Sequence, residues 1–171
     1  MKDNLNSINC PACGKVMEKI YMSEQKFNID ICSKGCGGLF LDNREFNKID
    51  EPHENIDEIT EALKGKVFQE VDSAALRVCP VCRTNMVKNH VSARKEIEID
   101  ECYGCGGKFL DHGELEQMRG QYATATERDA DVVKYVYGLK NVELAKVEAD
   151  AKKARENRSP LQNLFGALLG F

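Results

Sequence analysis

Cys79-Pro80-Val81-Cys82 is followed, after nineteen residues, by Cys102-Tyr103-Gly104-Cys105-Gly106-Gly107. The same pattern occurs earlier as Cys10-Pro11-Ala12-Cys13 and, after eighteen residues, Cys32-Ser33-Lys34-Gly35-Cys36-Gly37-Gly38. Two cysteines separated by two residues can bind one metal ion from a single tight turn, and a second such turn completes a tetrahedral four-sulfur zinc site. The two copies therefore predict two Zn2+ ions per chain, each in a structural site.

The two copies together use all eight cysteines of the 171-residue chain. The predicted metal ligands are Cys10, Cys13, Cys32 and Cys36 in the first site, and Cys79, Cys82, Cys102 and Cys105 in the second. In the first copy the second cysteine turn is one residue wider, and Gly35 is a candidate for the extra bend. We therefore expect the first site to be the weaker one. In the second copy Arg83 replaces Gly14, which predicts strain in that turn.

The similarity continues past the fourth cysteine, where residues 37–42 (GGLFLD) match residues 106–111 (GGKFLD). Duplication of one module is the simplest account of this repeat. The glycine pair predicts a turn that needs a positive φ angle and that points backbone N–H groups at the thiolate sulfurs.

Each copy predicts a β-hairpin followed by a short helix. Residues 27–31 and 97–100 alternate apolar and polar side chains, which is typical of a strand with one buried face. Asp42 and Asp111 are predicted helix N-caps, each with a glutamate three residues later that completes a capping box. The predicted fold class is a small, metal-bound α+β protein with two zinc ribbons, followed by a long helix and a short amphipathic C-terminal helix.

Composition and motifs divide the chain into consecutive segments. They are a first zinc ribbon (1–50), an acidic helical linker (51–77), a second zinc ribbon (78–120), a long helix (121–158) and an amphipathic C-terminal helix (159–171). In the linker, Ile56, Ile59 and Leu63 have helical spacing and predict one apolar face. Thr126 is the predicted cap of the long helix.

The phrase C-P-x-C, a spacer and then C-x-x-C-G-G-x-F-L-D-x-G-E-L resembles the zinc ribbon of the transcription-factor-IIB-like zinc-finger family. Residues 79–118 match this pattern closely. Residues 10–49 match it with two departures, the wider cysteine turn and Asn43-Arg44-Glu45-Phe46 in place of x-G-E-L. The resemblance implies zinc binding and a ribbon fold. The family name points to transcription, but the resemblance implies no particular reaction or partner.

Charge and hydropathy narrow the classes of partner. A net charge of −4 argues against a general nucleic-acid binder, so nucleic-acid binding is expected to be weak. The N-terminal residues lack the apolar core of a signal peptide, and no apolar run is long enough to predict a membrane span. We therefore expect a cytoplasmic protein, because a reducing compartment favours metal-bound cysteines over disulfides.

The last thirteen residues predict an amphipathic helix that begins at a Ser159 cap and holds no charged side chain. Its apolar face would consist of Leu161, Leu164, Phe165, Leu168 and Leu169. Such a face needs a cover, which can be the chain's own ribbons, a second copy or a partner protein. A membrane surface is disfavoured, because membrane-surface helices normally carry a basic polar face. We expect a protein partner or self-association.

The sequence shows no catalytic constellation. His53, His90 and His112 have no partner at motif spacing and are expected to be ordinary surface residues. Zinc bound by four thiolates has no open position for water or substrate, so we do not expect an enzyme. The leading hypothesis is a non-enzymatic zinc-binding adaptor that mediates protein–protein interaction.

Two alternatives stay open. One is a transcription-associated factor that contacts RNA polymerase or nucleic acid through the second ribbon. Its hairpin is locally basic, with Arg83, Lys88, Arg94 and Lys95. The other is a zinc-dependent redox sensor, because C-x-x-C also occurs as a redox dithiol, although that motif normally stands alone.

Overall fold

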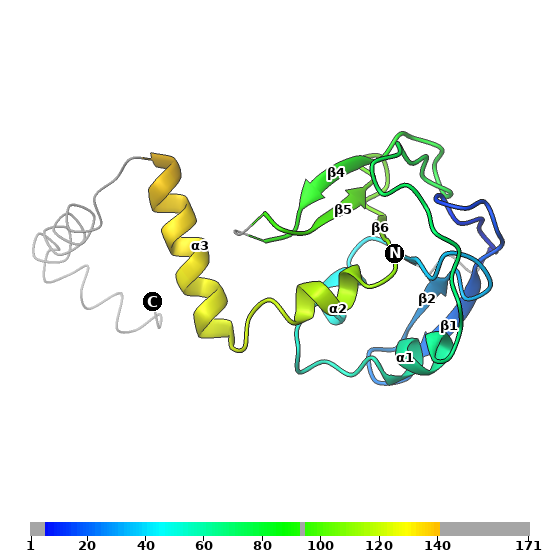
Figure 1. Cartoon of the computed structure of the whole chain (residues 1–171), viewed down its shortest axis with the longest axis horizontal. Coiled ribbons are helices and arrows are strands. Elements are labelled where there is room, and N and C mark those ends of the chain that lie inside the picture. Colours follow the sequence, from blue (N-terminus) through cyan, green and yellow to red (C-terminus); the bar gives the residue numbers. More distant parts are fainter. Residues whose placement is uncertain (1–5, 93–94, 141–171) are drawn as a thin grey trace, which may run out of the picture. The chain divides into compact units, whose positions relative to one another are not determined.

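The computed structural model describes residues 6–92 and 95–140. The chain divides into two compact units, Met1–Glu127 and Arg128–Phe171, and both zinc ribbons lie in the first (Figure 1).

In the described part of the first unit, six strands form one antiparallel sheet in the order β1-β2-β3-β6-β5-β4. The strands are β1 (Glu18–Met22), β2 (Phe27–Ile31), β3 (Leu39–Leu41), β4 (Val87–His90), β5 (Glu98–Glu101) and β6 (Lys108–Leu110). Strands β1 and β2 form the first predicted hairpin, and β4 and β5 form the second. The predicted fold class is confirmed for this unit.

Strands β3 and β6 join the two ribbons at the centre of the sheet. They pair antiparallel, with Phe40 directly opposite Phe109. Leu39 faces Leu110 and Leu41 faces Lys108, so the pairing relates equivalent residues of the two copies by an approximate two-fold axis. The sequence predicts two hairpins but not this joint.

Short helical segments cover one face of the sheet. They are η1, a 3-10 turn (Phe46–Lys48), α1 (Asp57–Leu63) and α2 (Glu114–Arg119). Ile59 of α1 and Leu115 of α2 are fully buried in the core on this face, and Ile56 and Leu63 pack against it. The predicted apolar face of the linker helix is therefore confirmed. The opposite face carries Phe40 and Phe109 and packs against the cysteine turns.

The predicted N-caps Asp42 and Asp111 are wrong. Each aspartate begins a tight turn, in which the N–H of Glu45 or Glu114 donates to the aspartate carbonyl at 3.1 or 3.2 Å. The N-cap therefore lies three residues later in the first ribbon and two residues later in the second. The structure places Glu45 and Gly113 at the two N-cap positions, without a side-chain cap. Half of each predicted capping box forms, because the glutamate Oε2 accepts the backbone N–H of the aspartate at 2.7 Å.

Arg44 and Gly113 occupy equivalent places in these two turns, and both have positive φ angles, of 75° and 89°. A left-handed conformation costs a non-glycine residue roughly 1–2 kcal/mol, which glycine avoids at a smaller entropic cost. Replacing the exposed Arg44 by glycine is therefore expected to stabilise the zinc-loaded chain by about 0.5–1 kcal/mol in urea unfolding. The reciprocal Gly113→Arg substitution should destabilise the chain by a similar amount. A destabilising Arg44→Gly change would contradict this account.

Glu114 lies half-buried at the start of α2, and burial raises the pKa of its carboxyl from 4.5 to about 7. A raised pKa in the folded state favours the protonated form, so this contribution to stability is complete below pH 4.5 and is lost as the pH rises through about 7. Glu114→Gln keeps an acceptor for the Asp111 N–H but cannot ionise. The variant should gain stability over the wild-type chain as the pH rises from about 5 to 8. Urea unfolding at several pH values measures this difference. A difference in free energy of unfolding between the variant and the wild type that stayed constant from about pH 5 to 8 would refute the prediction.

The helix α3 (Ala125–Lys140) is described up to Lys140, and the rest of the predicted long helix lies outside the described residues. Its predicted cap is wrong by two residues, because Thr124 Oγ1, not Thr126, accepts the N–H of Glu127 at 3.2 Å. Glu127, three residues after Thr124, accepts the N–H of Ala123, the residue before the cap, on its Oε2 atom at 3.1 Å. The predicted C-terminal helix 159–171 also lies outside the described residues. Among the described helices, none has the length and apolar character of a membrane span.

Candidate metal centres

The first cysteine turn has the same backbone geometry in both ribbons. The N–H of Gly14 donates to the carbonyl of Cys10 at 2.9 Å, and that of Arg83 donates to Cys79 at 3.0 Å. Gly14 and Arg83 have positive φ angles of 76° and 65°. The strain predicted at Arg83 is therefore confirmed.

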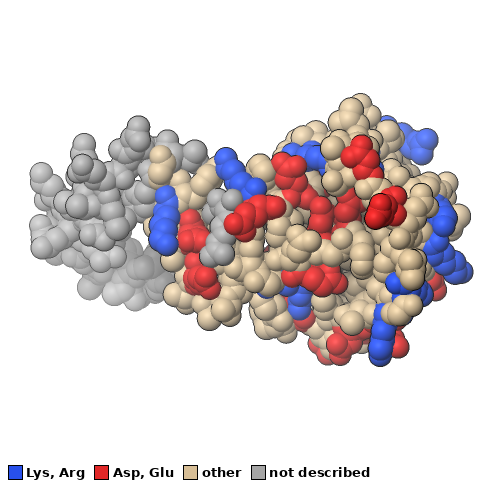
Figure 2. Space-filling model, viewed as in Figure 1, with Lys and Arg blue, Asp and Glu red and all other residues tan. Residues whose placement is uncertain are grey.

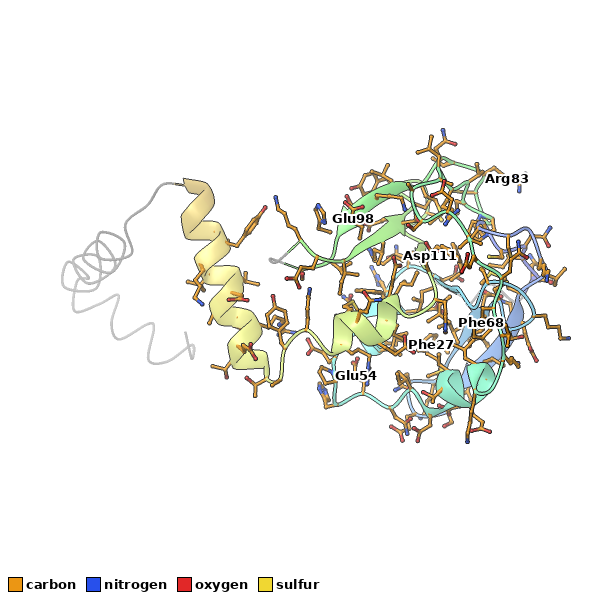
Figure 3. All side chains as sticks on the ribbon, in the orientation of Figure 1. Phe27, Glu54, Phe68, Arg83, Glu98 and Asp111 are labelled. Carbon is orange, nitrogen blue, oxygen red and sulfur yellow. The ribbon has the colours of Figure 1, made fainter. Side chains whose placement is uncertain are left out.

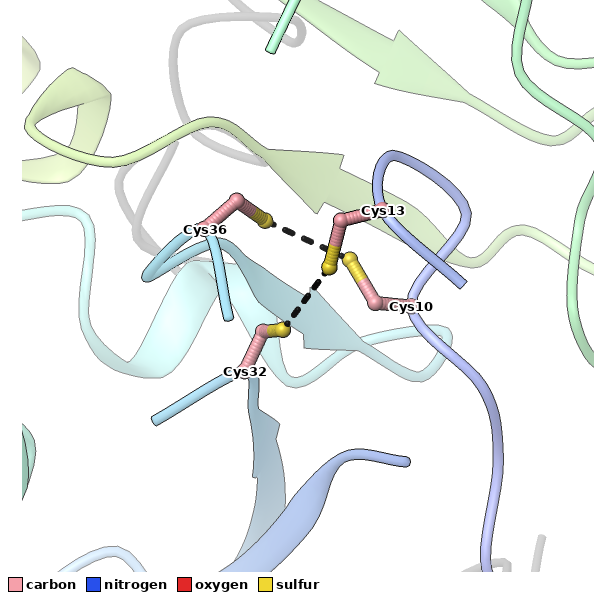
Figure 4. Close-up of side chains that lie close together, drawn as sticks. All are labelled: Cys10, Cys13, Cys32 and Cys36. Atoms are coloured by element: carbon pink, nitrogen blue, oxygen red, sulfur yellow. Dashed lines mark hydrogen bonds between the residues drawn. The ribbon is translucent and has the colours of Figure 1, made fainter. Parts of the chain in front are cut away.

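The four sulfurs of the first site lie together between the two cysteine turns. Cys10 Sγ is 3.4 Å from Cys36 Sγ, and Cys13 Sγ is 3.4 Å from Cys32 Sγ (Figure 4). All four sulfurs lie within 4.8 Å of one another.

The second site repeats this arrangement. Cys79 Sγ lies 3.6 Å from Cys105 Sγ, and Cys82 Sγ lies 3.2 Å from Cys102 Sγ. These four sulfurs also lie within 4.8 Å of one another. The structure thus brings the eight predicted ligands together in the two expected sets.

The sulfur spacing fits a zinc ion. A tetrahedral centre with zinc–sulfur bonds of about 2.3 Å places its sulfurs about 3.8 Å apart. The close pairs are only slightly shorter than this, so a small outward movement completes the geometry. Four thiolates fill the coordination shell, which is the arrangement of structural zinc. The chain accordingly has two four-cysteine metal sites and binds two zinc ions.

Glycine in the second cysteine turn makes room for the sulfurs. A Cβ atom on Gly35 would lie 2.6 Å from Cys32 Sγ and 2.8 Å from Cys13 Sγ. A Cβ atom on Gly104 would lie 3.1 Å from Cys82 Sγ. Gly35 lies in the wider turn, as the sequence suggested, and its N–H donates to the carbonyl of Cys32 at 3.1 Å. Because it has no side chain, it also allows the turn to approach the sulfurs closely.

Local contacts favour the thiolate form at one cysteine of each site, whereas burial raises the pKa of Cys32, Cys79 and Cys105. The pKa of Cys36 is lowered to about 5, first by contact with Cys10 Sγ and further by the backbone N–H of Gly38, against the opposing effect of burial. The pKa of Cys82 is lowered to about 6, chiefly by the Thr84 hydroxyl and then by its backbone N–H. The predicted contribution of backbone N–H groups in these turns is therefore confirmed at Gly38.

The two sites differ in exposure. In the first, Cys13 is half-buried and the other three cysteines are buried. In the second, Cys82 is exposed and Cys105 is half-buried. Solvent therefore reaches the second site more easily. The expectation that the first site is weaker stays a prediction, because it rests on the wider turn and not on burial.

Comparison with known families agrees with this geometry. A family model described as a transcription factor zinc-finger, of the transcription-factor-IIB ribbon type, matches residues 9–52 and 78–119, just over half of the chain. The chain belongs to the transcription factor zinc-finger family. Its two copies stand in tandem, as the motif resemblance predicted, and each contains one complete four-cysteine set. Neither the curated proteins nor the solved structures gave a significant match to this zinc-finger chain.

Among the described residues, no histidine belongs to either four-cysteine metal site. His53 is exposed. His90 Nε2 lies 3.4 Å from a carboxylate oxygen of Glu98. The ring of His112 packs against that of Phe68, with the ring centroids 4.4 Å apart.

A buried ion cluster is the feature that sequence reasoning missed. The Arg77 side chain is 3% exposed, and its Nη2 atom donates to both oxygens of Asp111 at 3.3 Å (Asp111 is labelled in Figure 3). Its Nε atom lies 3.8 Å from Asp100, which also pairs with Lys88 at 3.3 Å. The repeat held a partial signal, because the Lys88–Asp100 pair recurs in the first ribbon as Lys19–Asp30. Nothing in the first ribbon corresponds to Arg77, since Ile8 occupies the equivalent position.

Proposed function

We propose that this chain is a non-enzymatic zinc-binding adaptor, in which the second ribbon presents an apolar surface to another protein. Closed four-sulfur sites support a structural role for the zinc, because they leave no coordination position for a substrate. We place the adaptor in the cytoplasm, where reducing conditions keep cysteines available to metal.

The observation that carries the proposal is a difference between the two ribbons. Val81, Val87 and Tyr103 of the second ribbon are 39%, 45% and 68% exposed. These three residues are called the apolar ribbon surface below. Their counterparts in the first ribbon are small or polar: Ala12, Glu18 and Ser33. The shared fold therefore does not require large apolar side chains at these positions.

Contacts in both ribbons indicate that Val87 and Tyr103 are neighbours. In the first ribbon, the hydroxyl of Ser33 donates to Oε2 of Glu18 at 2.7 Å, so the equivalent positions touch. In the second, Nδ2 of Asn89 donates to the Tyr103 hydroxyl at 2.6 Å, so the tyrosine side chain runs back along β4. An aromatic ring with a polar tip beside an aliphatic side chain is typical of the core of a protein interface.

The charge beside this surface indicates the chemistry of the partner. Arg83 is exposed, and it lies at the outer end of the second ribbon, one residue after Cys82 (Figure 3). We infer a partner segment that offers apolar side chains flanked by carboxylates. The C-terminal face formed by residues 161–169 is a second predicted contact for a partner or another copy, and it lies outside the described residues.

The experiment exchanges Val87 and Tyr103, the two neighbouring residues of the apolar ribbon surface, for their counterparts in the first ribbon. Full-length wild-type chain and the double variant Val87→Glu, Tyr103→Ser are immobilised, and the retained proteins are identified by mass spectrometry. We expect the amount of each specific partner retained on the double variant to fall by about tenfold or more. The variant should keep two zinc ions and the melting temperature of the wild-type chain. Val67→Ser, at a linker residue that is 98% exposed, is the matched control and should retain them. Identical protein sets on all three chains would refute the adaptor surface.

The family description favours one alternative, a transcription-associated factor that contacts RNA polymerase or nucleic acid. Arg83 and Lys95 are exposed, as that function needs, but Lys88 is half-buried against Asp100 and Arg94 lies outside the described residues. On the face in Figure 2, Asp and Glu gather around the middle of the first unit, while Lys and Arg lie mainly toward its edges.

A DNA titration separates the two functions. Under the adaptor proposal, fluorescence anisotropy should detect only weak binding that disappears at physiological salt, because few phosphate contacts release counterions. Submicromolar affinity at that salt, lost in Arg83→Glu, would favour the alternative. Recovery of polymerase subunits on the wild-type chain would favour it as well.

A further inference from the structure

The two zinc sites share one packed core. This core lies on the face of the sheet opposite the helices, and it contains cysteines from both sites together with the two central phenylalanines. Its buried members are Ile8, Cys10, Met17, Cys32, Cys36, Phe40, Cys79, Met86, Cys102 and Phe109. A change at either site therefore acts on side chains that also surround the other.

Each central phenylalanine packs on the last cysteine turn of the opposite ribbon. A Cβ atom on Gly38 would lie 2.4 Å from Cζ of Phe109, and a Cβ atom on Gly107 would lie 2.6 Å from Cζ of Phe40. Neither Gly38 nor Gly107 is among the glycines with positive φ. The second position of each pair therefore requires glycine, because the phenylalanine ring of the other ribbon leaves no room there for a side chain.

The first glycine of each pair makes a similar contact with the opposite ribbon. Gly37 and Gly106 have positive φ angles of 78° and 80°. A Cβ atom on Gly37 would lie 3.0 Å from the ring of His112, and one on Gly106 would lie 2.7 Å from Cγ of Asn43. Asn43 and His112 are equivalent residues of the two copies. Each ribbon therefore makes the same two contacts with the glycine pair of the other ribbon.

These turns also hold the metal ligands. Gly38 accepts the N–H of Cys32 at 2.9 Å, and Gly107 accepts that of Cys102 at 2.8 Å. Phe109 consequently rests on backbone that positions ligands of the first site, and Phe40 does the same for the second. Each phenylalanine in turn lies on a short strand that directly follows its own ribbon's cysteine turn.

We propose that the two sites bind zinc cooperatively, because each ribbon supplies the ring that packs the other ribbon's last cysteine turn. A ribbon without zinc loses the fixed cysteine turns from which its central strand begins. Its phenylalanine then no longer supports the opposite turn, and the affinity of the opposite site for zinc falls. Thermodynamic linkage requires that this effect be equal in both directions.

The first test removes one ligand at a time from the full-length chain. Cys82→Ser leaves only the first site complete, and Cys13→Ser leaves only the second. Zinc affinity is measured by competition with a chromophoric chelator. We expect the intact site of each variant to bind zinc about tenfold or more weakly than in the wild-type chain, by the same factor in both. The wild-type chain should release both ions in one transition. One ion held with wild-type affinity in each variant would overturn the proposal.

A packing variant separates coupling from a general loss of folding. Phe109→Leu keeps all eight cysteines but withdraws the ring from Gly38, and it should split the release of zinc into two transitions. Phe27→Leu is the matched control, because Phe27 is 4% exposed in the core on the other face of the sheet. It should lower stability while both ions still leave together. If Cys82→Ser does not fold, this pair decides the question, and equal behaviour of the two phenylalanine variants would exclude the proposed packing route.

Discussion

Excess chelator is expected to remove two zinc ions per chain and to unfold the six-stranded sheet. Zinc bound by four thiolates contributes on the order of 10 kcal/mol to folding in small domains, which is comparable to the whole stability of a typical domain. Both sites lie in the same core, so no metal-free part of the sheet has a hydrophobic core of its own on that face. Loss of the β-sheet signal in circular dichroism should therefore accompany the release of metal.

Elemental analysis and X-ray absorption complete this test. The purified chain should contain two zinc ions per molecule with sulfur as the only ligand atom, and zinc added after chelation should restore the circular dichroism. A ratio of one zinc ion, a nitrogen ligand, or a native spectrum in the presence of chelator would each contradict the assignment. A Cys82→Ser chain that kept its native circular dichroism but lost a thiol-exchange activity would instead favour a redox sensor.

The metal sites could be predicted from sequence because their signals are local. Two residues between paired cysteines determine a tight turn, and the alternation in residues 27–31 indicates a strand with one buried face. The turn prediction at Arg83 succeeded for the same reason. Arg83 and Gly14 are equivalent residues of the two copies, so the backbone conformation that favours glycine at one position also applies at the other.

The joint between the ribbons could not be predicted in this way. Phe40 and Phe109 are 69 residues apart, and each lies in a three-residue strand that is too short to show a period. The glycine pairs were the part of the sequence that marked this joint. A positive φ angle accounts for Gly37 and Gly106, whereas Gly38 and Gly107 needed a neighbour that only the folded chain reveals.

The capping predictions failed for a related reason. The pattern of an aspartate followed by a glutamate at the third position fits both a capping box and a tight turn closed by the glutamate. At Asp111 the carboxylate binds Arg77, which lies 34 residues away in sequence. A distant partner thus occupies the side chain that the local pattern assigned to a helix.

Replacing Arg77 by alanine is expected to destabilise the zinc-loaded chain by about 3–5 kcal/mol, which is the effect of breaking a buried ion pair. Arg77 is 3% exposed, so its loss leaves the carboxylate of Asp111, which is 12% exposed, without this cation. Asp100 retains Lys88. The guanidinium also lies 5.9 Å from the centre of the Phe109 ring, so the substitution loosens the ring that packs against the first zinc site.

Urea unfolding at saturating zinc measures this effect, and two further variants define its origin. Lys64→Ala removes an ion pair whose partners are 71% and 75% exposed, and it should change stability by less than about 1 kcal/mol. Arg77→Ile combined with Asp111→Asn copies the isoleucine of the first ribbon and removes the stranded charge, so it should recover part of the loss. A loss of under about 1 kcal/mol in Arg77→Ala would mean that water reaches the cluster. Full loss in the double variant would instead assign the effect to packing on Phe109, because no unpaired charge would remain at Asp111.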